Sequence, residues 1–475
     1  MRALLTPVLF LLLASSCLAQ AVAASPAPPL PRGQVIESVA SVNDPAETYA
    51  LYLPLNYTPD RAWPIIYAFD PLARGVVPVR RYKDIAEKYG FILAGSNNSR
   101  NFSMQESSKA ASAIWDDTHL RLALDSRRAY TTGFSGGARM AGMIAFRCNP
   151  CRIAGVIAHG AGYPLGEQPN GNNSPIYFLA VGDEDFNWPE VMQVRRAREQ
   201  SGLPYRAEVF HGPHQWAPAS VFEDAVVWIQ LKSMQSGVQP RNNELIDTQF
   251  TKTQAALGDA VDRGETLVQL GALRSLVSDF EGLKEVSSFR QKLADLKASP
   301  ALNRALKQED SAINSQQASS SVLFSELGQL ETSSSEDRDQ LRSLVVDQMV
   351  RLKHDAARAK SEDKRPPLVR AFSSVQASYI ESGQAQFEAK HYDLAEFYFQ
   401  IVADVSPEEI WPVLLLAETS AARGNRKQAI SRLRQTAKLG LNNPEAYQQD
   451  RNLQNLQNDP EYQTFLSDLK SEIRK

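Results

Sequence analysis

The sequence has few cysteines, few histidines and almost no net charge. Its 475 residues include three cysteines and six histidines, and the formal net charge is -3. A charge so close to zero gives the chain no overall field that would draw it to nucleic acid or anionic lipid, so we expect neither as a partner. In the C-terminal half, no group of histidines, cysteines and carboxylates has the spacing of metal ligands, and we expect no metal.

The apolar run at the N-terminus is too short to span a membrane. Residues 4–13 are almost all apolar, whereas a spanning helix needs roughly 20 such residues. Small residues follow, which is the layout of a cleaved secretory signal over residues 1–24, with cleavage at Ala23 or Ala24. A membrane anchor and lipidation at Cys17 are the alternatives. We expect an exported protein, periplasmic or secreted, without a membrane span.

Removal of the signal would leave two cysteines, Cys148 and Cys151, in a C-x-x-C spacing. Disulfides persist in exported proteins, so we expect these two residues to form a local disulfide. The alternative is a thioredoxin-like redox pair, which needs its first cysteine at a helix N-terminus directly after a strand. Here the pair is expected to follow a helix and precede a strand, which favours the structural disulfide.

The length of the chain suggests two or three folded units. A Pro-rich linker is expected over residues 25–34. From 35 to 236, apolar strand-like runs alternate with helical segments, which predicts an α/β fold with a doubly wound, mostly parallel sheet. The expected strands are 48–53, 64–69, 91–95, 129–134, 153–159, 176–181 and 206–210; the expected helices are 107–124, one opening after Ser135, 189–200 and one beginning at Ser220.

Beyond this domain the strand signals disappear. We expect a helical segment over 237–309, a Ser-rich loop or disordered segment over 310–336, and a helical region over 337–475. In the last of these, Gly383, Ala395 and Phe399 recur 34 residues later as Ala417, Ala429 and Leu433. That period resembles the tetratricopeptide repeat, although a plain helical bundle would also fit. Such a region would serve as a docking or oligomerisation surface, with a protein as its possible partner.

The strongest motif is a G-x-S-x-G pattern centred on Ser135. A β-rich run enters it and a helix is expected to leave it. On such a tight strand-to-helix turn, the glycines at 133 and 137 avoid collisions and the serine hydroxyl is exposed. The backbone amide of Gly136 would then point at a developing oxyanion, and the helix N-terminus would favour that charge.

A serine hydroxyl needs an imidazole to take its proton and a carboxylate to orient that imidazole. After Ser135 come a strand ending in Asp183 and Asp185, and then a strand ending in His211 and His214. We assign His214 as the general base and Asp185 as its orienting acid. Their rivals are His211, which could be an ordinary strand-end residue, and Asp183, which could cap the turn.

These stretches make residues 45–235 resemble the α/β-hydrolase esterases of the polyhydroxybutyrate-depolymerase and feruloyl-esterase type. In that family the acid lies three residues after the strand-end glycine and the base precedes an aromatic residue, which places the roles on Asp185 and His214. One departure is the segment after the third expected strand, where Asp70-Pro71-Leu72 replaces the usual His-Gly. Proline has no N–H, so the second oxyanion donor is expected to be the amide of Leu72.

The expected activity is hydrolysis of a small-molecule or polymeric carboxylic ester through an acyl-enzyme, without a cofactor. Two alternatives remain: an inactive hydrolase-like scaffold that binds a protein partner through its helical repeats, and attack on an amide instead of an ester. We expect the other histidines to be structural; they are His119, His159, His354 and His391. We expect the aromatic residues that flank the proposed site to line a pocket or to pack; they are Phe134, Tyr163, Phe186, Trp188 and Trp216.

Overall fold

A computed structural model describes residues 30–148, 151–167, 174–361 and 364–473. The expected signal over 1–24 lies outside these residues, as does most of the expected linker. Residues 32–475 form one compact unit, and the description below concerns that unit. No helix of the described residues is both long and apolar enough to cross a membrane.

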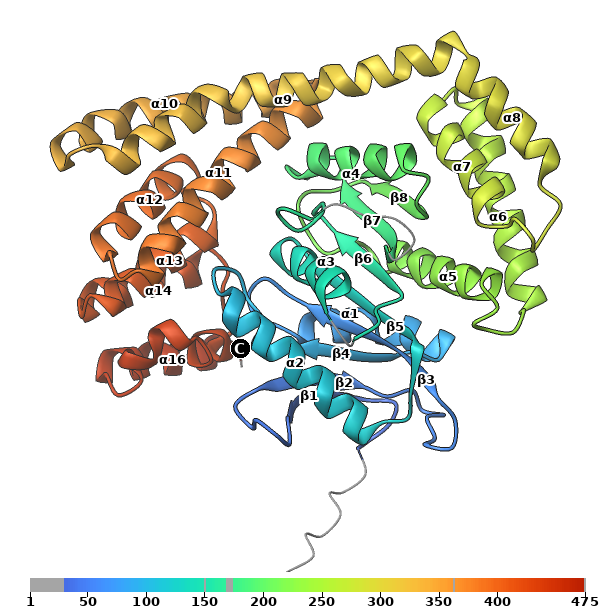
Figure 1. Ribbon diagram of the computed structural model, residues 1–475. Helices are drawn as coiled ribbons and strands as arrows, with labels where there is room; N and C mark the ends of the chain where they lie inside the picture. The colour runs from blue at the N-terminus through green and yellow to red at the C-terminus, as the bar shows by residue number, and fades with distance from the viewer. Residues whose placement is uncertain (1–29, 149–150, 168–173, 362–363, 474–475) are drawn as a thin grey trace, which may run out of the picture. The chain divides into compact units, whose positions relative to one another are not determined.

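An eight-stranded sheet forms the centre of the N-terminal domain, in the order β1-β2-β4-β3-β5-β6-β7-β8 (Figure 1). Strand β2 pairs antiparallel with β1 and β4. The six neighbouring strands β4, β3, β5, β6, β7 and β8 run parallel to one another. This is the strand order of an α/β-hydrolase, and the expected fold class is confirmed. The strands are β1 (Val35–Ala40), β2 (Thr48–Tyr52), β3 (Trp63–Phe69), β4 (Ile92–Ser96), β5 (Leu124–Phe134), β6 (Gly155–His159), β7 (Ile176–Gly182) and β8 (Tyr205–Phe210).

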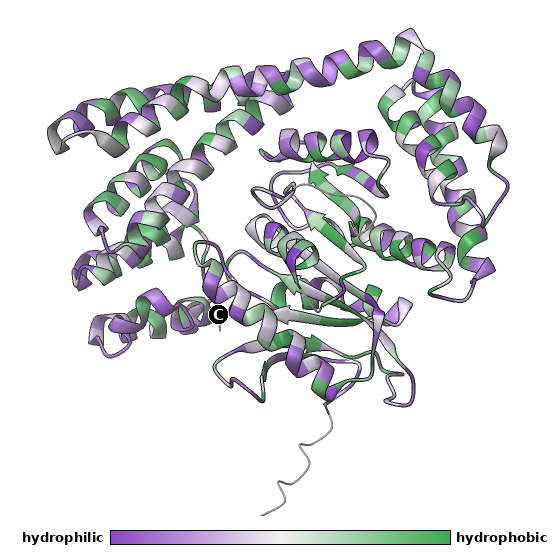
Figure 2. Ribbon diagram, in the orientation of Figure 1, coloured by the Kyte–Doolittle hydropathy of each residue, from purple (hydrophilic) through white to green (hydrophobic). Residues whose placement is uncertain are grey.

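Helices cover both faces of this sheet. On one face, Ile66 and Phe178 pack with residues of α1 and α5 in a single apolar core. On the other face, Tyr67 bonds to Thr118 of α2, and Tyr177 stacks on Phe146 of α3. Burial on both faces explains why the central strands read as continuous apolar runs (Figure 2). The helices are α1 (Val76–Tyr89), α2 (Met104–Arg121), α3 (Gly136–Arg147), α4 (Trp188–Gln200) and α5 (Ala219–Gln235).

The rest of the chain is helical and joins the hydrolase domain through α5. Trp228 of α5 donates a buried hydrogen bond to Asp279 at the end of α7. The elements are α6 (Asn243–Asp262), α7 (Thr266–Ser278), α8 (Ser287–Ala298), α9 (Pro300–Thr332), α10 (Ser335–Arg358), α11 (Arg365–Glu388), α12 (Tyr392–Val405), α13 (Ile410–Ala422), α14 (Arg426–Lys438), α15 (Pro444–Gln448), η2 (Arg451–Leu456) and α16 (Pro460–Ile473).

The expected loop or disordered segment over 310–336 is wrong for most of its length, because helix α9 runs through it to Thr332. Buried Leu323, Leu327 and Leu330 recur at helical spacing and pack against α10 and α11. The serines fit a helix because Ser320 donates its hydroxyl proton to the carbonyl of Gln316 one turn earlier. The Ser-rich break is only the short join between α9 and α10, where Ser334 caps α10.

The 34-residue period coincides with helix pairs. Gly383 of α11 lies against the ring of Phe399 of α12, where any Cβ would collide with that ring. Ala417 of α13 shares an apolar cluster with Ala429 and Leu433 of α14. The small residues therefore lie where paired helices meet; their assignment to the tetratricopeptide family stays a prediction.

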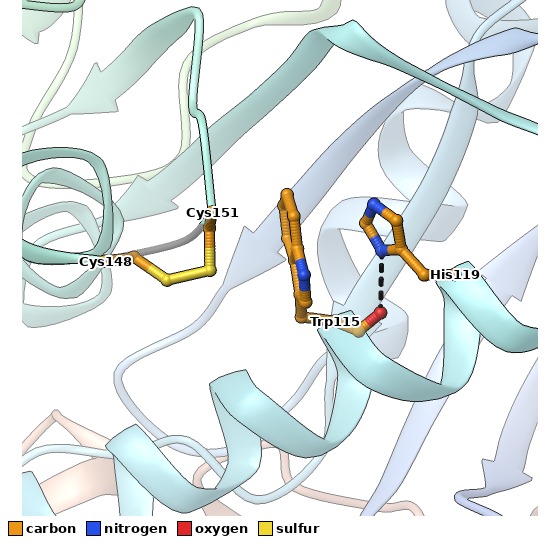
Figure 3. The surroundings of a disulfide bond; sticks show 4 residues. All are labelled: Trp115, His119, Cys148 and Cys151. Atoms are coloured by element: carbon orange, nitrogen blue, oxygen red, sulfur yellow. Dashed lines mark hydrogen bonds between the residues drawn. A yellow bond between two sulfur atoms is a disulfide. The ribbon is translucent and has the colours of Figure 1, made fainter.

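Cys148 and Cys151 form the expected disulfide (Figure 3). Cys148 caps the C-terminal end of α3, and Cys151 precedes β6. The first cysteine thus lacks the helix N-terminus that a redox pair requires. Figure 3 also shows His119, an exposed histidine whose Nδ1 bonds the Trp115 carbonyl within α2 (2.8 Å).

Candidate active site

Ser135 lies between β5 and α3 in a backbone conformation that side chains rarely adopt, with φ 53° and ψ -123°. Neighbouring backbone fixes it there, because its amide donates to the His159 carbonyl (2.9 Å). The glycines of the motif are required by space: a Cβ at Gly133 would collide with the Gly137 carbonyl, and one at Gly137 with the Phe69 carbonyl. The turn is therefore the strained elbow that the motif predicted.

The Gly136 amide is free to donate. Gly136 is the first residue of α3, and a first-turn N–H has no acceptor within its own helix. Among the described residues no other acceptor contacts it. It therefore points a free donor and the positive end of the helix toward the space beside Ser135.

Asp185 and His214 are brought together. Asp185 follows β7 and has a fully buried side chain, and its Oδ1 lies 2.8 Å from Nδ1 of His214, which follows β8. The same oxygen accepts the Asn187 amide (2.8 Å). The imidazole packs against the rings of Phe134 and Phe186, at centroid distances of 4.5 and 4.2 Å. With Nδ1 bound to the carboxylate, Nε2 is left for a reacting group.

Gly160, which the sequence reading missed, brings this pair close to Ser135. It has φ 59°, and a Cβ there would collide with the Asp185 carboxylate and crowd the His214 ring. Its neighbour His159 is the residue whose carbonyl holds the Ser135 amide. Among the described residues, no direct hydrogen bond joins Ser135 to His214; such bonds are often long in unliganded enzymes and shorten when substrate binds.

The rival residues pair with each other. His211 Nδ1 lies 2.9 Å from Asp183 Oδ2, and the His211 side chain is 85% exposed. The hydrogen bond and charge of Asp183 raise the pKa of His211. Asp183 also accepts the Gly212 amide (2.9 Å), as a residue that stabilises the turn would. The rival pair therefore lies on the surface, away from the buried Asp185.

His159 is a core residue, as expected. Its ring is buried against Tyr82 and Trp216, and Nε2 contacts the Thr132 hydroxyl (3.1 Å). Burial lowers its pKa to about 3, and nearby Arg81 adds to the shift. The imidazole therefore stays neutral at physiological pH.

The amide of Leu72, which the sequence predicted as the second oxyanion donor, already has a hydrogen-bond acceptor. The amide of Leu72 donates to Oδ1 of Asp70, two residues before it (2.9 Å), as aspartates in turns commonly do. Asp70 is fully buried and also accepts hydrogen bonds from Arg74 and from Nε1 of Trp216 (3.0 Å). Asp70 thus ties this loop to the segment carrying His214, and it occupies the Leu72 amide.

The helical region holds the loop that carries Asp185. Arg370 of α11 is almost fully buried and donates to the Asp183 carbonyl (2.6 Å) and to Gln316 of α9 (2.8 Å). Its guanidinium lies 4.3 Å from the ring centroid of Trp188. Gln316 in turn donates to the Phe186 carbonyl (3.0 Å). Burial lowers the pKa of Arg370 to about 10, so it remains charged at neutral pH.

A carboxyl group of α11 also faces the site. The Glu381 side chain is exposed at its tip, but the protein packed around it raises the pKa of its carboxyl group, and the charge of Arg139 opposes that shift. Arg139 lies on α3 one turn after Ser135 and pairs with Glu190 (2.7 Å). A cavity of about 2590 Å³ borders the acid loop at Asp183 and Trp188 and extends along β8 and parts of α4 to α9, and its lining includes neither Ser135 nor His214.

Comparisons with known proteins concern the fold. No family model matches the sequence, and a search of curated proteins found no match. Similar solved structures include the fluorophosphonate-binding serine hydrolase F of Staphylococcus aureus (14% identity, 42% of this chain and 99% of that chain, TM-score 0.34). Another is a ferulic acid esterase (16% identity, 41% of this chain and 94% of that chain, TM-score 0.34). A third is the carboxylesterase EstE1, cloned from a metagenomic library (12% identity, 44% of this chain and 91% of that chain, TM-score 0.33). At these scores and identities, the likenesses say nothing about activity.

Proposed function

We propose that the chain is an exported serine hydrolase that cleaves carboxylic esters through an acyl-enzyme on Ser135. The observation that carries the proposal is the buried hydrogen bond between Asp185 and His214 beside a serine in a strained strand-to-helix turn. A surface histidine or a structural serine needs neither the strain nor the buried carboxylate.

In the proposed reaction, the Ser135 hydroxyl attacks the ester carbonyl while Nε2 of His214 takes its proton. Asp185 holds the ring in the tautomer that leaves Nε2 free and stabilises the imidazolium. The carbonyl oxygen becomes an oxyanion and accepts a hydrogen bond from the Gly136 amide. The imidazolium then protonates the departing alkoxide, which leaves as the alcohol. In the second step His214 takes a proton from the water that attacks the acyl-enzyme and returns it to the Ser135 oxygen as the acid is released. The substrate is a small-molecule or polymeric ester.

Substitution of Ser135 tests this function. In Ser135→Ala, turnover of p-nitrophenyl acetate is expected to fall by at least about a thousandfold, because the covalent step is lost. The matched control is Ser201→Ala, an exposed serine whose hydroxyl bonds only its own helix. Full turnover in a folded Ser135→Ala protein would refute the nucleophile.

One observation favours a second candidate, a scaffold without activity that binds a protein through its helical repeats. The Leu72 amide is occupied by Asp70, so the expected oxyanion hole is incomplete. A fluorophosphonate probe separates the two candidates because only an activated serine reacts with it. A scaffold would leave Ser135 unlabelled.

A further inference from the structure

Ester hydrolysis on Ser135 needs a second donor for the oxyanion. Two hydrogen bonds usually hold that charge, and the loss of one costs on the order of a hundred- to a thousandfold in rate. The Gly136 amide supplies one, whereas the Leu72 amide is bound to Asp70. Another N–H group close to Gly136 would complete the site.

The side chain of Asn101 lies at that position. A Cβ built on Gly136 would collide with the Asn101 carboxamide, and the three atoms nearest to such a Cβ all belong to that carboxamide. Gly136 does not have the positive φ that would itself call for glycine. A glycine directly after Ser135 is therefore explained by the space that Asn101 takes.

The main chain holds Asn101 firmly in place. Its amide donates to the Pro71 carbonyl (2.9 Å), and the preceding Arg100 forms a β-bridge with Leu72. The next residue, Phe102, has φ 66°, which is unfavourable for a side chain of that size. Such local strain concentrates at functional sites, where surrounding structure maintains it.

The Asn101 carboxamide has no hydrogen-bond partner within the described part of the chain. It is partly exposed, so a bound substrate can reach it. Rotation of the carboxamide by 180° exchanges its oxygen and nitrogen without moving the group, so its N–H can face an anion. This differs from Asn97 on the same loop, whose side-chain nitrogen is bound to the Glu37 carbonyl (3.0 Å).

We propose that Asn101 is a catalytic residue whose Nδ2 donates the second hydrogen bond to the oxyanion; this rests on the proposed function. As the bond from Ser135 Oγ to the acyl carbon forms, the proton passes to His214 and the carbonyl electron pair moves onto oxygen. That oxygen then accepts from the Gly136 amide and from Asn101. When the carbonyl reforms, the alkoxide leaves and takes the proton from His214.

Three single variants of the full chain test the assignment with p-nitrophenyl acetate. Asn101→Ala and Asn101→Asp are expected to lower kcat by on the order of a hundred- to a thousandfold with KM changed by less than about threefold, because the donor acts mainly in the transition state. Asn101→Asp keeps the size of the side chain, which separates loss of the donor from loss of packing. The control Asn97→Ala loses an asparagine from the same loop and is expected to keep its kcat.

The outcomes separate this assignment from the function on which it rests. If wild-type turnover depends on Ser135 and Asn101→Asp retains kcat within about threefold, Asn101 is not the donor while the hydrolase proposal stands. If the wild type shows no turnover that depends on Ser135, the proposed function fails, and the donor role fails with it. A rise in KM at constant kcat in the Asn101 variants would also overturn the assignment, because it indicates ground-state binding.

Discussion

The hydrolase domain and the helical region each bury a carboxylate, and they surround it differently. Asp185 has a histidine and a backbone amide as partners. Glu418 of α13 faces another carboxyl, Asp450, and accepts one hydrogen bond from Asn452 (2.6 Å). A carboxylate that is hydrogen-bonded to an imidazole can assist proton transfer. A carboxylate held against a second carboxylate is destabilised by the like charge, which favours its protonated form.

The two regions meet at the loop that carries Asp185. Arg370 and Gln316 of the helical region donate to backbone carbonyls of that loop. The helical region therefore acts on the proposed site through its acid, besides offering a surface for a partner. This connection can be tested by substitutions in the helical region whose effect on kcat is then measured.

The largest effect is expected from the acid. Asp185→Asn would leave the shape of the site intact but allow the wrong His214 tautomer, so we expect kcat for p-nitrophenyl acetate to fall on the order of 10³- to 10⁴-fold. Asp183→Asn is the matched control, because Asp183 is paired with exposed His211, and it should keep kcat within a few-fold. A larger loss in Asp183→Asn than in Asp185→Asn would show that the roles are reversed.

A smaller effect is expected from the contact between the regions. Arg370→Met keeps an apolar stem but removes the hydrogen bonds to Asp183 and Gln316, which loosens the acid loop. We expect kcat to fall by roughly ten- to a hundredfold with KM little changed, since small misplacements of catalytic groups are costly. Arg342→Met is the control, because Arg342 pairs with Asp404 within the helical region. Equal kinetics in both variants would mean that the helical region does not position the acid.

The smallest effect is on stability and concerns Glu418. Burial, and then the Asp450 charge, raise its pKa well above the usual value. Because the folded state binds the Glu418 proton more tightly than the unfolded chain does, protonated Glu418 contributes to the stability of the fold at low pH. This contribution is lost as the pH rises through the raised pKa. Glu418→Gln removes the cost of ionising a buried carboxyl group. We therefore expect it to raise the free energy of unfolding by about 1 kcal/mol at pH 8 and by less at pH 5.

Thermal unfolding at the two pH values measures this difference. Glu445→Gln is the control, because Glu445 is exposed. If Glu418→Gln destabilises the protein at pH 8, the Glu418 carboxylate is well paired and the contrast between the two regions disappears.

Sequence patterns predicted the hydrolase domain well because its signals are local. Buried parallel strands read as apolar runs, and the glycines around Ser135 are required by contacts within the turn. The choice between Asp183 and Asp185 was harder, since both follow the same strand. What separates them is which carboxylate turns inward: the side chain of Asp185 is fully buried, whereas that of Asp183 is 36% exposed.

Other features could not be read locally. The Leu72 amide is lost to Asp70 because of a turn that the sequence alone did not specify. Asn101 and Arg370 reach the site from other parts of the chain, and no motif indicated them. In α9, the serines suggested a break, but buried leucines at helical spacing prevailed because α10 and α11 pack against them. Only tertiary contacts decide such positions.

The most direct test of the central claim is intact and peptide mass spectrometry of the protein after reaction with a fluorophosphonate. The account predicts one adduct per chain, located on Ser135, with a labelling rate that falls strongly in Asp185→Asn and little in Asp183→Asn. An adduct on another serine, or no adduct on the folded wild type, would contradict it.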